Sequence, residues 1–276
     1  MRYREFAPPD ALRRHVRCVW HLKVPAAPAH IDTVYPDGCC EIIAHRLAPM
    51  HAFGETTGWR QQERCIFAGQ QRSAIRLAAQ SDADCLGVRL QPAASAMLRD
   101  ISLPRLRDRI VDLVWLDAAF AGRFYEAASQ TRAELAVAAI FALLRDGMQP
   151  IDERIEQAVA KLEASEGTLP IAAIAAACGM SERSFQGAFK ARVGLNAKEF
   201  ARIRRLQATI RMLDEADHRV ADLAIASGFA DQAHATREVR RVTGTTPARL
   251  RAALQQDRNG QSSVRLAAAF VRGHSV

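Results

Sequence analysis

Two stretches of similar pattern, 171–189 and 220–237, follow one another in the second half of the chain. In each, a short run rich in alanine leads to a glycine, Gly179 or Gly228, and a polar run that opens with Ser or Asp comes next. Glycine accepts the positive φ of a tight turn between two helices, and Ser or Asp caps the helix that follows. The repeat therefore predicts two helix-turn-helix units and an all-helical fold for this part of the chain.

The first unit can be followed residue by residue. Pro170 suits the first turn of a helix, and Ser181 is a natural N-cap for the next one. Phe185 and Phe189 are four residues apart, so they lie on one helix face and are expected to point to the interior. The outer face of this helix is left to Glu182, Arg183, Gln186 and Gly187.

The second unit repeats this arrangement, with Asp231 as the cap. Ala235 and Val239 occupy the positions that Phe185 and Phe189 hold in the first unit. Its outer face carries Gln232, Ala233, Thr236 and Arg237. A glycine follows the second helix of both units, so the repeat covers the whole unit and not only its turn.

Helix-turn-helix units bind DNA by placing their second helix in the major groove. Gln side chains pair with adenine and Arg side chains with guanine, so the two outer faces are expected to contact bases. The predicted base contacts are Arg183, Gln186, Gly187, Gln232, Ala233, Thr236 and Arg237. The predicted contacts to DNA phosphates are Ser181, Arg202, Arg204, Arg205, Arg240 and Arg241.

The distribution of charge agrees with a polyanionic partner. The chain has a formal net charge of +8. Residues 168–257 hold 14 Lys and Arg against 9 Asp and Glu, so an excess of five positive charges lies where DNA is expected. A basic balance alone does not identify DNA, and the assignment depends on the two matched units.

Two other classes of protein are compatible with such units. A sequence-neutral architectural DNA binder would bind all duplexes with similar affinity and a steep dependence on salt. A cupin-type enzyme fused to a DNA-binding module would need catalytic residues, but the sequence has no nucleophile–base set and no glycine-rich phosphate loop. We therefore predict no enzymatic activity and no cofactor.

Residues 1–100 are predicted to be rich in β-strands. Runs with strand composition occur at 30–35, 39–44, 74–77 and 85–90. Pro36, Asp37 and Gly38 have turn chemistry, so the second run is expected to return beside the first. Short strands at this spacing are typical of a sandwich or a small barrel.

Residues 101–150 are predicted to be helical, because apolar residues recur at helical spacing through much of the segment. This is more apolar surface than a linker needs, so we expect the segment to pack against the same segment of a second protomer in a homodimer. The alternative is that it packs on its own β domain. Residues 151–257 are predicted to form the DNA-binding domain, and no function is assigned to the tail at 258–276.

Metal and thiol chemistry find little support in the sequence. No metal site is expected, because His45 and His51 are six residues apart and no His-x-His pair occurs. The six cysteines include the adjacent Cys39 and Cys40 but no CxxC pair. They are either small buried hydrophobic residues or part of a thiol sensor.

Several other side chains have two interpretations. Trp20, Tyr35 and Trp59 either line an apolar ligand pocket or belong to the core. Glu41 and Arg89 either pair to stabilise a sheet or hold a polar ligand. No apolar run is long enough to span a membrane, so a cytoplasmic protein with reduced thiols is expected.

Residues 152–254 resemble the DNA-binding domain of the AraC/XylS family of bacterial transcription regulators. The resemblance rests on 220–224, 228–231, His234, Arg237, 240–241 and 244–247. It implies seven helices, in which one long helix at 197–213 links the two helix-turn-helix units. It also implies that the base contacts fall on the residues named above.

Two positions differ from the family pattern. Gly187 replaces a long polar residue, so this position is expected to contact no base. Ala235 and Val239 are smaller than the residues usual there. The core of the second unit is therefore expected to be underpacked unless neighbouring side chains fill the space.

The N-terminal part resembles a sub-group of the same family through 15–20, 35–38, 41–43, 67–71 and 86–92. The resemblance implies a cupin-like β-rich regulatory domain and a homodimer, and it says nothing about a ligand. We expect either a small-molecule effector or another form of regulation. Activation through a contact with RNA polymerase is the tendency of the family, and the sequence equally permits repression by occlusion. The full prediction is an α+β multidomain protein. Its N-terminal domain would control sequence-specific binding of two adjacent DNA segments by an all-α double helix-turn-helix domain.

Overall fold

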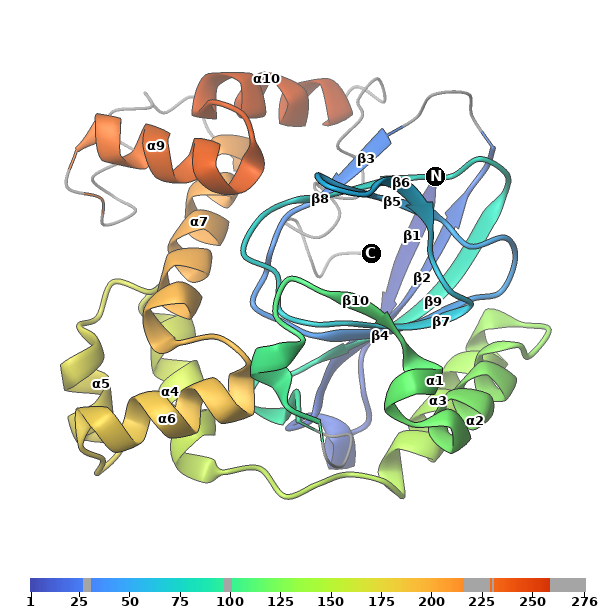
Figure 1. Cartoon of the computed structure of the whole chain (residues 1–276), viewed down its shortest axis with the longest axis horizontal. Helices are drawn as coiled ribbons and strands as arrows, with labels where there is room; N and C mark the ends of the chain where they lie inside the picture. Colours follow the sequence, from blue (N-terminus) through green and yellow to red (C-terminus); the bar gives the residue numbers. More distant parts are fainter. Residues whose placement is uncertain (27–30, 97–100, 216–228, 230, 259–276) are drawn as a thin grey trace.

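The computed structural model describes residues 1–26, 31–96, 101–215, 229 and 231–258. Two antiparallel sheets form the N-terminal part, and helices form the C-terminal part (Figure 1). The predicted α+β organisation is therefore confirmed, with a β-sandwich in front of an all-helical region.

The sandwich consists of a six-stranded sheet and a four-stranded sheet. In spatial order, the larger sheet contains β1 (Arg2–Phe6), β2 (Val16–Val24), β9 (Ala83–Leu90), β4 (Glu41–His45), β7 (Cys65–Ala68) and β10 (Ile110–Asp112). The smaller sheet contains β3 (Ile31–Val34), β8 (Ile75–Ala78), β5 (His51–Gly54) and β6 (Gly58–Gln61).

The large sheet is buried on both faces: helices cover one face and the small sheet covers the other, as the side chains of strand β4 illustrate. Successive side chains of a strand point to opposite faces. Ile42 and Ala44 belong to a cluster that includes helical residues, whereas Ile43 packs in the cluster between the sheets. Glu41 and His45 share the face of Ile43 and line the space between the sheets.

The predicted strands exist, but the expected pairing of the first two is wrong. Strand β3 lies in the small sheet and β4 in the large one, so the turn between them crosses from sheet to sheet. The physical reason is that the turn docks on a C-terminal helix: a Cβ atom on Gly38 would lie 2.7 Å from the Phe200 ring. A tight hairpin would withdraw the turn from this contact.

The segment 101–150 packs on its own β domain, as the alternative interpretation held. It contains β10, α1 (Leu113–Leu116), α2 (Ala118–Ala128) and α3 (Ala133–Arg145). Phe124, Ile140 and Leu144 are fully buried, in one cluster with Ile42 and Leu86 of the large sheet. The apolar face that was expected to contact a second protomer is therefore covered by the large sheet of the same chain.

The C-terminal part contains α4 (Glu153–Ala164), α5 (Ile171–Ala177), α6 (Glu182–Val193), α7 (Ala197–Glu215), α9 (Gln232–Thr243) and α10 (Pro247–Arg258). Helix α7, in light orange in Figure 1, runs from the group α4–α6 to the group α9–α10. The first helix expected for the second unit, within 220–227, lies outside the described residues, as does most of the tail. Among the described helices, none has both the length and the apolar character to cross a membrane.

The cysteines are all buried and unbonded to one another. Burial raises the pKa of Cys18, Cys40 and Cys85 to about 12, so these groups stay protonated at neutral pH. Protonated, shielded thiols react slowly, which favours the small-hydrophobe interpretation over a sensor. In the part of the chain that the structure describes, no three His, Cys, Asp or Glu side chains gather as a metal site would require.

Candidate nucleic-acid interface

The first helix-turn-helix unit is formed as its sequence predicts. Gly179 has a φ of +66° in the turn between α5 and α6. Ser181 caps α6, because its Oγ accepts a hydrogen bond from the Ser184 backbone N–H at 3.3 Å. Phe185 and Phe189 are fully buried, and the Phe189 ring lies 5.7 Å from the Phe200 ring of α7. These contacts fix α6 to α7 and leave its other face free.

The free face of α6 carries the residues expected to contact bases. Arg183 and Gly187 are exposed, and Gln186 is half-buried. Because Gly187 has no side chain, the contact surface consists mainly of one guanidinium and one amide. These are the two groups that bond guanine and adenine edges in the major groove.

Helix α9 presents a corresponding face. The Asp231 carboxylate accepts a hydrogen bond from the His234 backbone N–H at 2.6 Å, which caps the helix. Ala235 and Val239 are buried, as expected. The opposite face carries Gln232, Ala233 and Arg237, which are exposed, and Thr236, which is half-buried.

Most of the residues expected to meet phosphates are accessible. Ser181, Arg202, Arg240 and Arg241 are exposed. Arg202 and Arg241 line a hollow of about 70 Å³ between α7 and α9. Arg205 is half-buried with its guanidinium 5.8 Å from the centre of the Phe229 ring, and burial lowers its pKa.

Arg204 is placed differently from the expectation. Its Nη1 donates a hydrogen bond to the backbone carbonyl of Asp37 at 3.1 Å, so the side chain is held by the β domain. The residue is half-buried on the side of α7 that faces the sandwich, whereas Arg202 is exposed. Arg204 therefore serves the interface between domains in this conformation and is not available to a phosphate.

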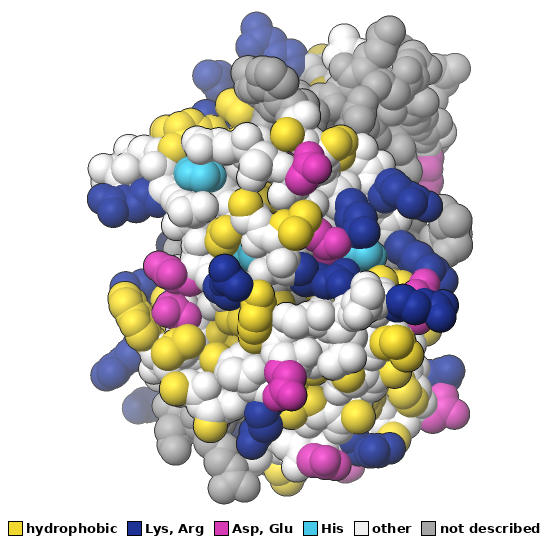
Figure 2. All heavy atoms as spheres, turned by 90° about the vertical axis from the view of Figure 1, so that its right-hand side faces the viewer, with side chains coloured by type: hydrophobic (Ala, Val, Ile, Leu, Met, Phe, Trp, Pro, Cys, Tyr) yellow, Lys and Arg dark blue, Asp and Glu magenta, His cyan; other side chains and the backbone are white. Residues whose placement is uncertain are grey.

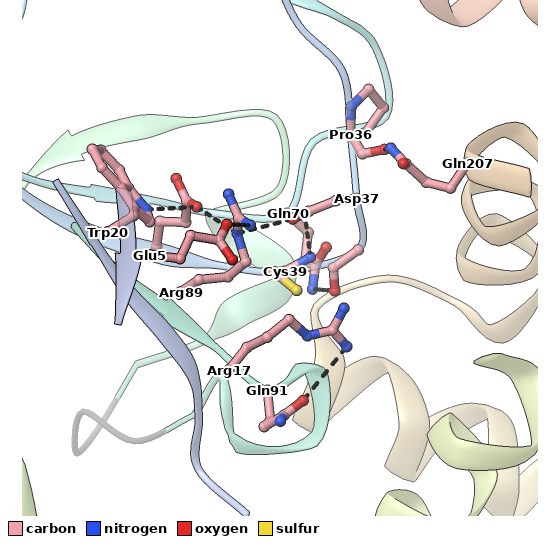
Figure 3. A network of polar contacts seen from close by, with 12 residues as sticks. Glu5, Arg17, Trp20, Pro36, Asp37, Cys39, Gln70, Arg89, Gln91 and Gln207 are labelled. Atoms are coloured by element: carbon pink, nitrogen blue, oxygen red, sulfur yellow. Dashed lines mark hydrogen bonds and ion pairs between the residues drawn. The ribbon is translucent and has the colours of Figure 1, made fainter. Parts of the chain in front are cut away.

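The crossing turn at residues 35–38, which we call the docking loop, is the centre of that interface. Gln207 of α7 donates a hydrogen bond to the Pro36 carbonyl, next to the Arg204 contact (Figure 3). Gly38 adopts a φ of +85° and packs on Phe200. The carbonyl of Gly38 is held in turn by Gln70 of the β domain at 2.7 Å. The loop thus bonds to both domains at once.

Tyr35, the first residue of the docking loop, lies inside the second helix-turn-helix unit. It is 4% exposed and belongs to one buried cluster with residues of α7, α9 and α10. The cluster consists of Tyr35, Leu206, Ile210, Leu213, Val239, Val242, Leu250 and Leu254. An aromatic ring from the β domain thus supplies volume beside the small Val239. Sequence reasoning missed this role, although the small residues in α9 signalled that a neighbour was needed.

Further contacts attach helices α4, α6 and α9 to the sandwich. The Ala74 backbone N–H donates to the Val242 carbonyl of α9 at 2.8 Å. Arg17 of β2 pairs with Glu163 of α4 at 2.5 Å. Helix α6 lies against two short turns of the β domain, η2 (Pro92–Ala94) and η3 (Leu103–Arg105). The positions of α6 and α9 therefore depend on one common support.

The face of the sandwich away from α5–α9 has a different surface. Figure 2 shows Lys and Arg intermingled with Asp and Glu there, and hydrophobic side chains in small groups. A surface of mixed charge does not favour the binding of a polyanion such as DNA. The exposed polar faces of α6 and α9 remain the best candidate surface for DNA.

Comparison with known proteins agrees with this assignment. Residues 174–253 match a family described as a helix-turn-helix domain, and residues 4–112 match a domain of unknown function, DUF6597. The chain is 36% identical over 91 residues to the probable transcription factor PqrA of Proteus vulgaris. That alignment covers 33% of this chain and 74% of PqrA.

Two solved structures are also similar. A transcriptional regulator of Chromobacterium violaceum with an AraC-type DNA-binding domain is 26% identical, with a TM-score of 0.36 over 38% of this chain and 94% of its own. ToxT of Vibrio cholerae is 10% identical, with a TM-score of 0.45 over 85% and 97% of the two chains. From the match to PqrA and the helix-turn-helix domain, we conclude that the chain belongs to the AraC/XylS family: it is a transcription factor and not an enzyme, and it binds DNA through its helix-turn-helix domain.

Proposed function

We propose that this transcription factor is sequence-specific and contacts two adjacent major-groove segments, one with α6 and one with α9. The observation that carries the proposal is the pair of capped helices with exposed polar faces, joined by α7. Helix α7 has 19 residues and so spans about 28 Å at 1.5 Å per residue. Neighbouring major-groove segments on one side of DNA are about 34 Å apart, which a rigid helix of this length can bridge.

Within this proposal the contacts divide into two kinds. Arg183, Gln186, Gln232, Thr236 and Arg237 would discriminate between bases. Ser181, Arg202, Arg205, Arg240 and Arg241 would hold the backbone. Gly187, which has no side chain, and Ala233, which has a small one, lie on the same helix faces and would let the bases approach the helices closely. Phosphate contacts add affinity for every sequence, whereas base contacts distinguish one sequence from another.

Replacing Arg183 by alanine is expected to relax the preference for one base without abolishing binding. A good bidentate contact contributes about 1–3 kcal/mol of discrimination against the wrong base. The measurement is selection of bound sequences from a randomised pool at physiological salt, with the full chain. The wild type should yield two boxes about one helical turn apart.

The matched control is Arg240→Ala, which changes an exposed arginine of α9 expected to meet a phosphate. It should weaken all sequences alike and reduce the slope of log affinity against log salt by about 1. The same selected motif from wild type and Arg183→Ala would contradict the assignment of Arg183. Recovery of no motif by the wild type, despite tight binding, would favour the architectural alternative.

The proposal divides the chain into a regulatory part, 1–150, and a DNA-binding part, 151–257. A small-molecule effector bound to the regulatory part would act on α7 and α9 through the docking loop, which contacts Arg204, Gln207 and the cluster of α9. The protein would work in the cytoplasm, where bacterial DNA lies, and an activating complex would contact RNA polymerase.

A homodimer is also proposed, although the apolar face of α2 and α3 is already buried. The surface that remains for it includes Val114, Trp115 and Leu135, which are 50%, 82% and 54% exposed. Sedimentation of the full chain at micromolar concentration should show a dimer. Trp115→Glu should shift it to monomer, and Leu47→Glu, at a similarly exposed leucine of the β domain, should not. A strict monomer in the wild type would end the dimer proposal.

A further inference from the structure

We propose that the β domain takes part directly in DNA binding, and that Arg72 contacts a phosphate of the duplex together with Arg202 of α7 and Arg241 of α9. The inference rests on the proposed function in one respect, namely that Arg202 and Arg241 meet DNA phosphates. It gives the β domain a direct contact with DNA, in addition to its support of α7 and α9. Because the partner is the phosphodiester backbone, the contact is independent of base sequence.

The three arginines line one hollow where the two domains meet. The hollow measures about 70 Å³, and its walls come from the loop at 69–74 between β7 and β8, from the first two turns of α7 and from the end of α9. Arg72, Arg202 and Arg241 are all exposed to solvent. A space of this size holds a few water molecules, so it has room for the oxygens of one phosphate group.

The loop that carries Arg72 is fixed beside the end of α9. The backbone N–H of Ala74, the last residue of the loop, donates a hydrogen bond to the Val242 carbonyl at 2.8 Å. Near the start of the loop, the Gln70 carbonyl accepts a hydrogen bond from the Asp108 backbone N–H, also at 2.8 Å. Backbone bonds on both sides of Arg72 therefore keep it at the hollow.

Asp108 positions the Arg72 side chain. Its φ of +58° lies in the left-handed region, which residues other than glycine rarely adopt. In this conformation its carboxylate accepts hydrogen bonds from the Arg72 backbone N–H at 2.8 Å and from Nε at 2.6 Å, and it also pairs with Nη2. The third nitrogen, Nη1, lies 3.3 Å from Glu199 of α7. The guanidinium is thus ordered before DNA binds, which lowers the entropic cost of the contact.

Positive charge prevails at the hollow. Among the described residues, three guanidinium groups line it against one carboxylate, that of Glu199. The charged groups that pair with this lining are Arg107 at 3.6 Å from Glu199, Asp108 beside Arg72, and Glu238 at 3.0 Å from Arg241. Counted together, four arginines still exceed three acids. The hollow therefore attracts an anion, and the planar fork of a guanidinium suits the oxygens of a phosphate.

The position of the hollow on α9 makes DNA the source of that phosphate. Arg241 is one helical turn after Arg237, on the exposed side of α9 that also carries Ala233. Four residues of a helix span about 6 Å. A DNA strand whose bases reach Arg237 therefore brings its phosphates past Arg241. Arg72 lines the same hollow, so the β domain reaches the same stretch of backbone.

The first test is the salt dependence of DNA affinity, measured with the full-length protein on one duplex. Arg72→Gln should weaken binding roughly 3- to 10-fold at physiological salt, the factor for one lost hydrogen-bonded contact. It should also reduce the slope of log affinity against log salt by about 0.9, the value for one phosphate. Arg72→Lys keeps the charge and should retain most of the slope. An equal slope in the wild type and in Arg72→Gln would overturn the proposal.

The matched control is Arg123→Gln, which makes the same change of net charge. Arg123 is an exposed residue of α2, and α2 lies away from α7 and α9 in Figure 1. This variant should keep the salt slope of the wild type. A slope reduced as much as in Arg72→Gln would mean that net charge alone sets the salt dependence, and the phosphate contact would be rejected.

Glu199→Gln separates a phosphate contact from a purely structural bridge between the domains. Oε2 of Glu199 accepts a hydrogen bond from the Asn196 backbone N–H at 3.0 Å, and a Gln oxygen can accept the same bond. The substitution removes the negative charge beside Arg72, so it should strengthen DNA binding about 2- to 5-fold. If Arg72 only tied the β domain to α7, Glu199→Gln would weaken binding as Arg72→Gln does. Weaker binding by Glu199→Gln, or stronger binding by both variants, would contradict the phosphate contact.

Two further outcomes separate this inference from its alternatives. Arg72→Gln should select the same base motif as the wild type, because a phosphate contact does not discriminate between bases. A slope that Arg240→Ala reduces and Arg72→Gln does not would keep the phosphate contacts of the helices and reject that of the β domain. Inorganic phosphate that binds the DNA-free protein at millimolar concentration, in a titration followed by ³¹P resonance, and that Arg72→Gln releases, would assign the hollow to a free anion and overturn the contact with DNA.

Discussion

Tyr35→Ala is expected to lower the free energy of unfolding of the second helix-turn-helix unit by about 3–5 kcal/mol, the range for aromatic-to-alanine changes in a core. The physical reason is a cavity in the cluster that holds Val239 and Val242, whose other buried members are all aliphatic. Because α9 packs through this cluster, its contacts with DNA should be lost. The contacts of α6, which belongs to another cluster, should persist.

The measurement is DNA affinity on duplexes that carry both boxes or only one, together with thermal unfolding. Tyr35→Ala should bind the two-box duplex no better than a duplex with the α6 box alone. Tyr35→Phe retains the ring and should behave like the wild type. Trp59→Ala removes an aromatic residue of the β domain that is 38% exposed, and it should leave DNA binding unchanged. Full two-box affinity in Tyr35→Ala would show that the ring does not support α9.

Arg89→Met is expected to destabilise the β domain by about 3–5 kcal/mol at pH 8, because it removes one partner of a buried ionic cluster. Glu5, Asp37 and Glu41 would then face each other without their counter-ion. Burial already raises the pKa of Glu41, and Arg89 opposes this rise in the wild type. Without the guanidinium, the pKa of Glu41 should rise further.

The sign of the pH dependence follows from this rise. A carboxyl group with a folded-state pKa above its unfolded value stabilises the fold at low pH and loses that contribution as pH rises through the folded pKa. The deficit of Arg89→Met should therefore be smaller at pH 5 than at pH 8, as measured by urea unfolding at both values. The control is Arg4→Met, since the Arg4–Glu134 pair is exposed and such pairs contribute at most about 1 kcal/mol. An equal deficit at both pH values would mean that Glu41 does not take up the proton.

Local chemistry made the helical half predictable from the sequence. Gly179, Ser181 and Asp231 act through bonds to their near neighbours, so the turns and caps could be assigned without knowledge of the rest of the fold. Phe185 and Phe189 were placed in the core by spacing alone, and they are buried there.

The sandwich was harder to predict because the order of its strands depends on contacts between residues that are distant in the sequence. Strand β2 is buried on both faces over much of its length. It therefore lacks the alternation of apolar and polar residues that marks a strand with one solvent-exposed face. The partners of β3 and β4 could not be deduced from the turn between them, since the turn conforms to Phe200 and α7. The contact of Arg204 with the Asp37 carbonyl, and the placing of Tyr35 in a core shared with α9, could not be deduced for the same reason: both depend on which domain lies opposite.

The position of Tyr35 bears on how this protein can vary between species. Its ring shares one buried cluster with Val239, so a larger side chain at position 239 should be accompanied by a smaller one elsewhere in the cluster, position 35 included, in homologous chains. Exchange of the whole regulatory domain for one from a distant homologue would remove the Tyr35 ring from the cluster of α9, whereas the cluster of α6 would lose only Ala93 among its buried members. Such a chimaera would keep one of its two DNA contacts, so the two domains of this chain are not interchangeable modules.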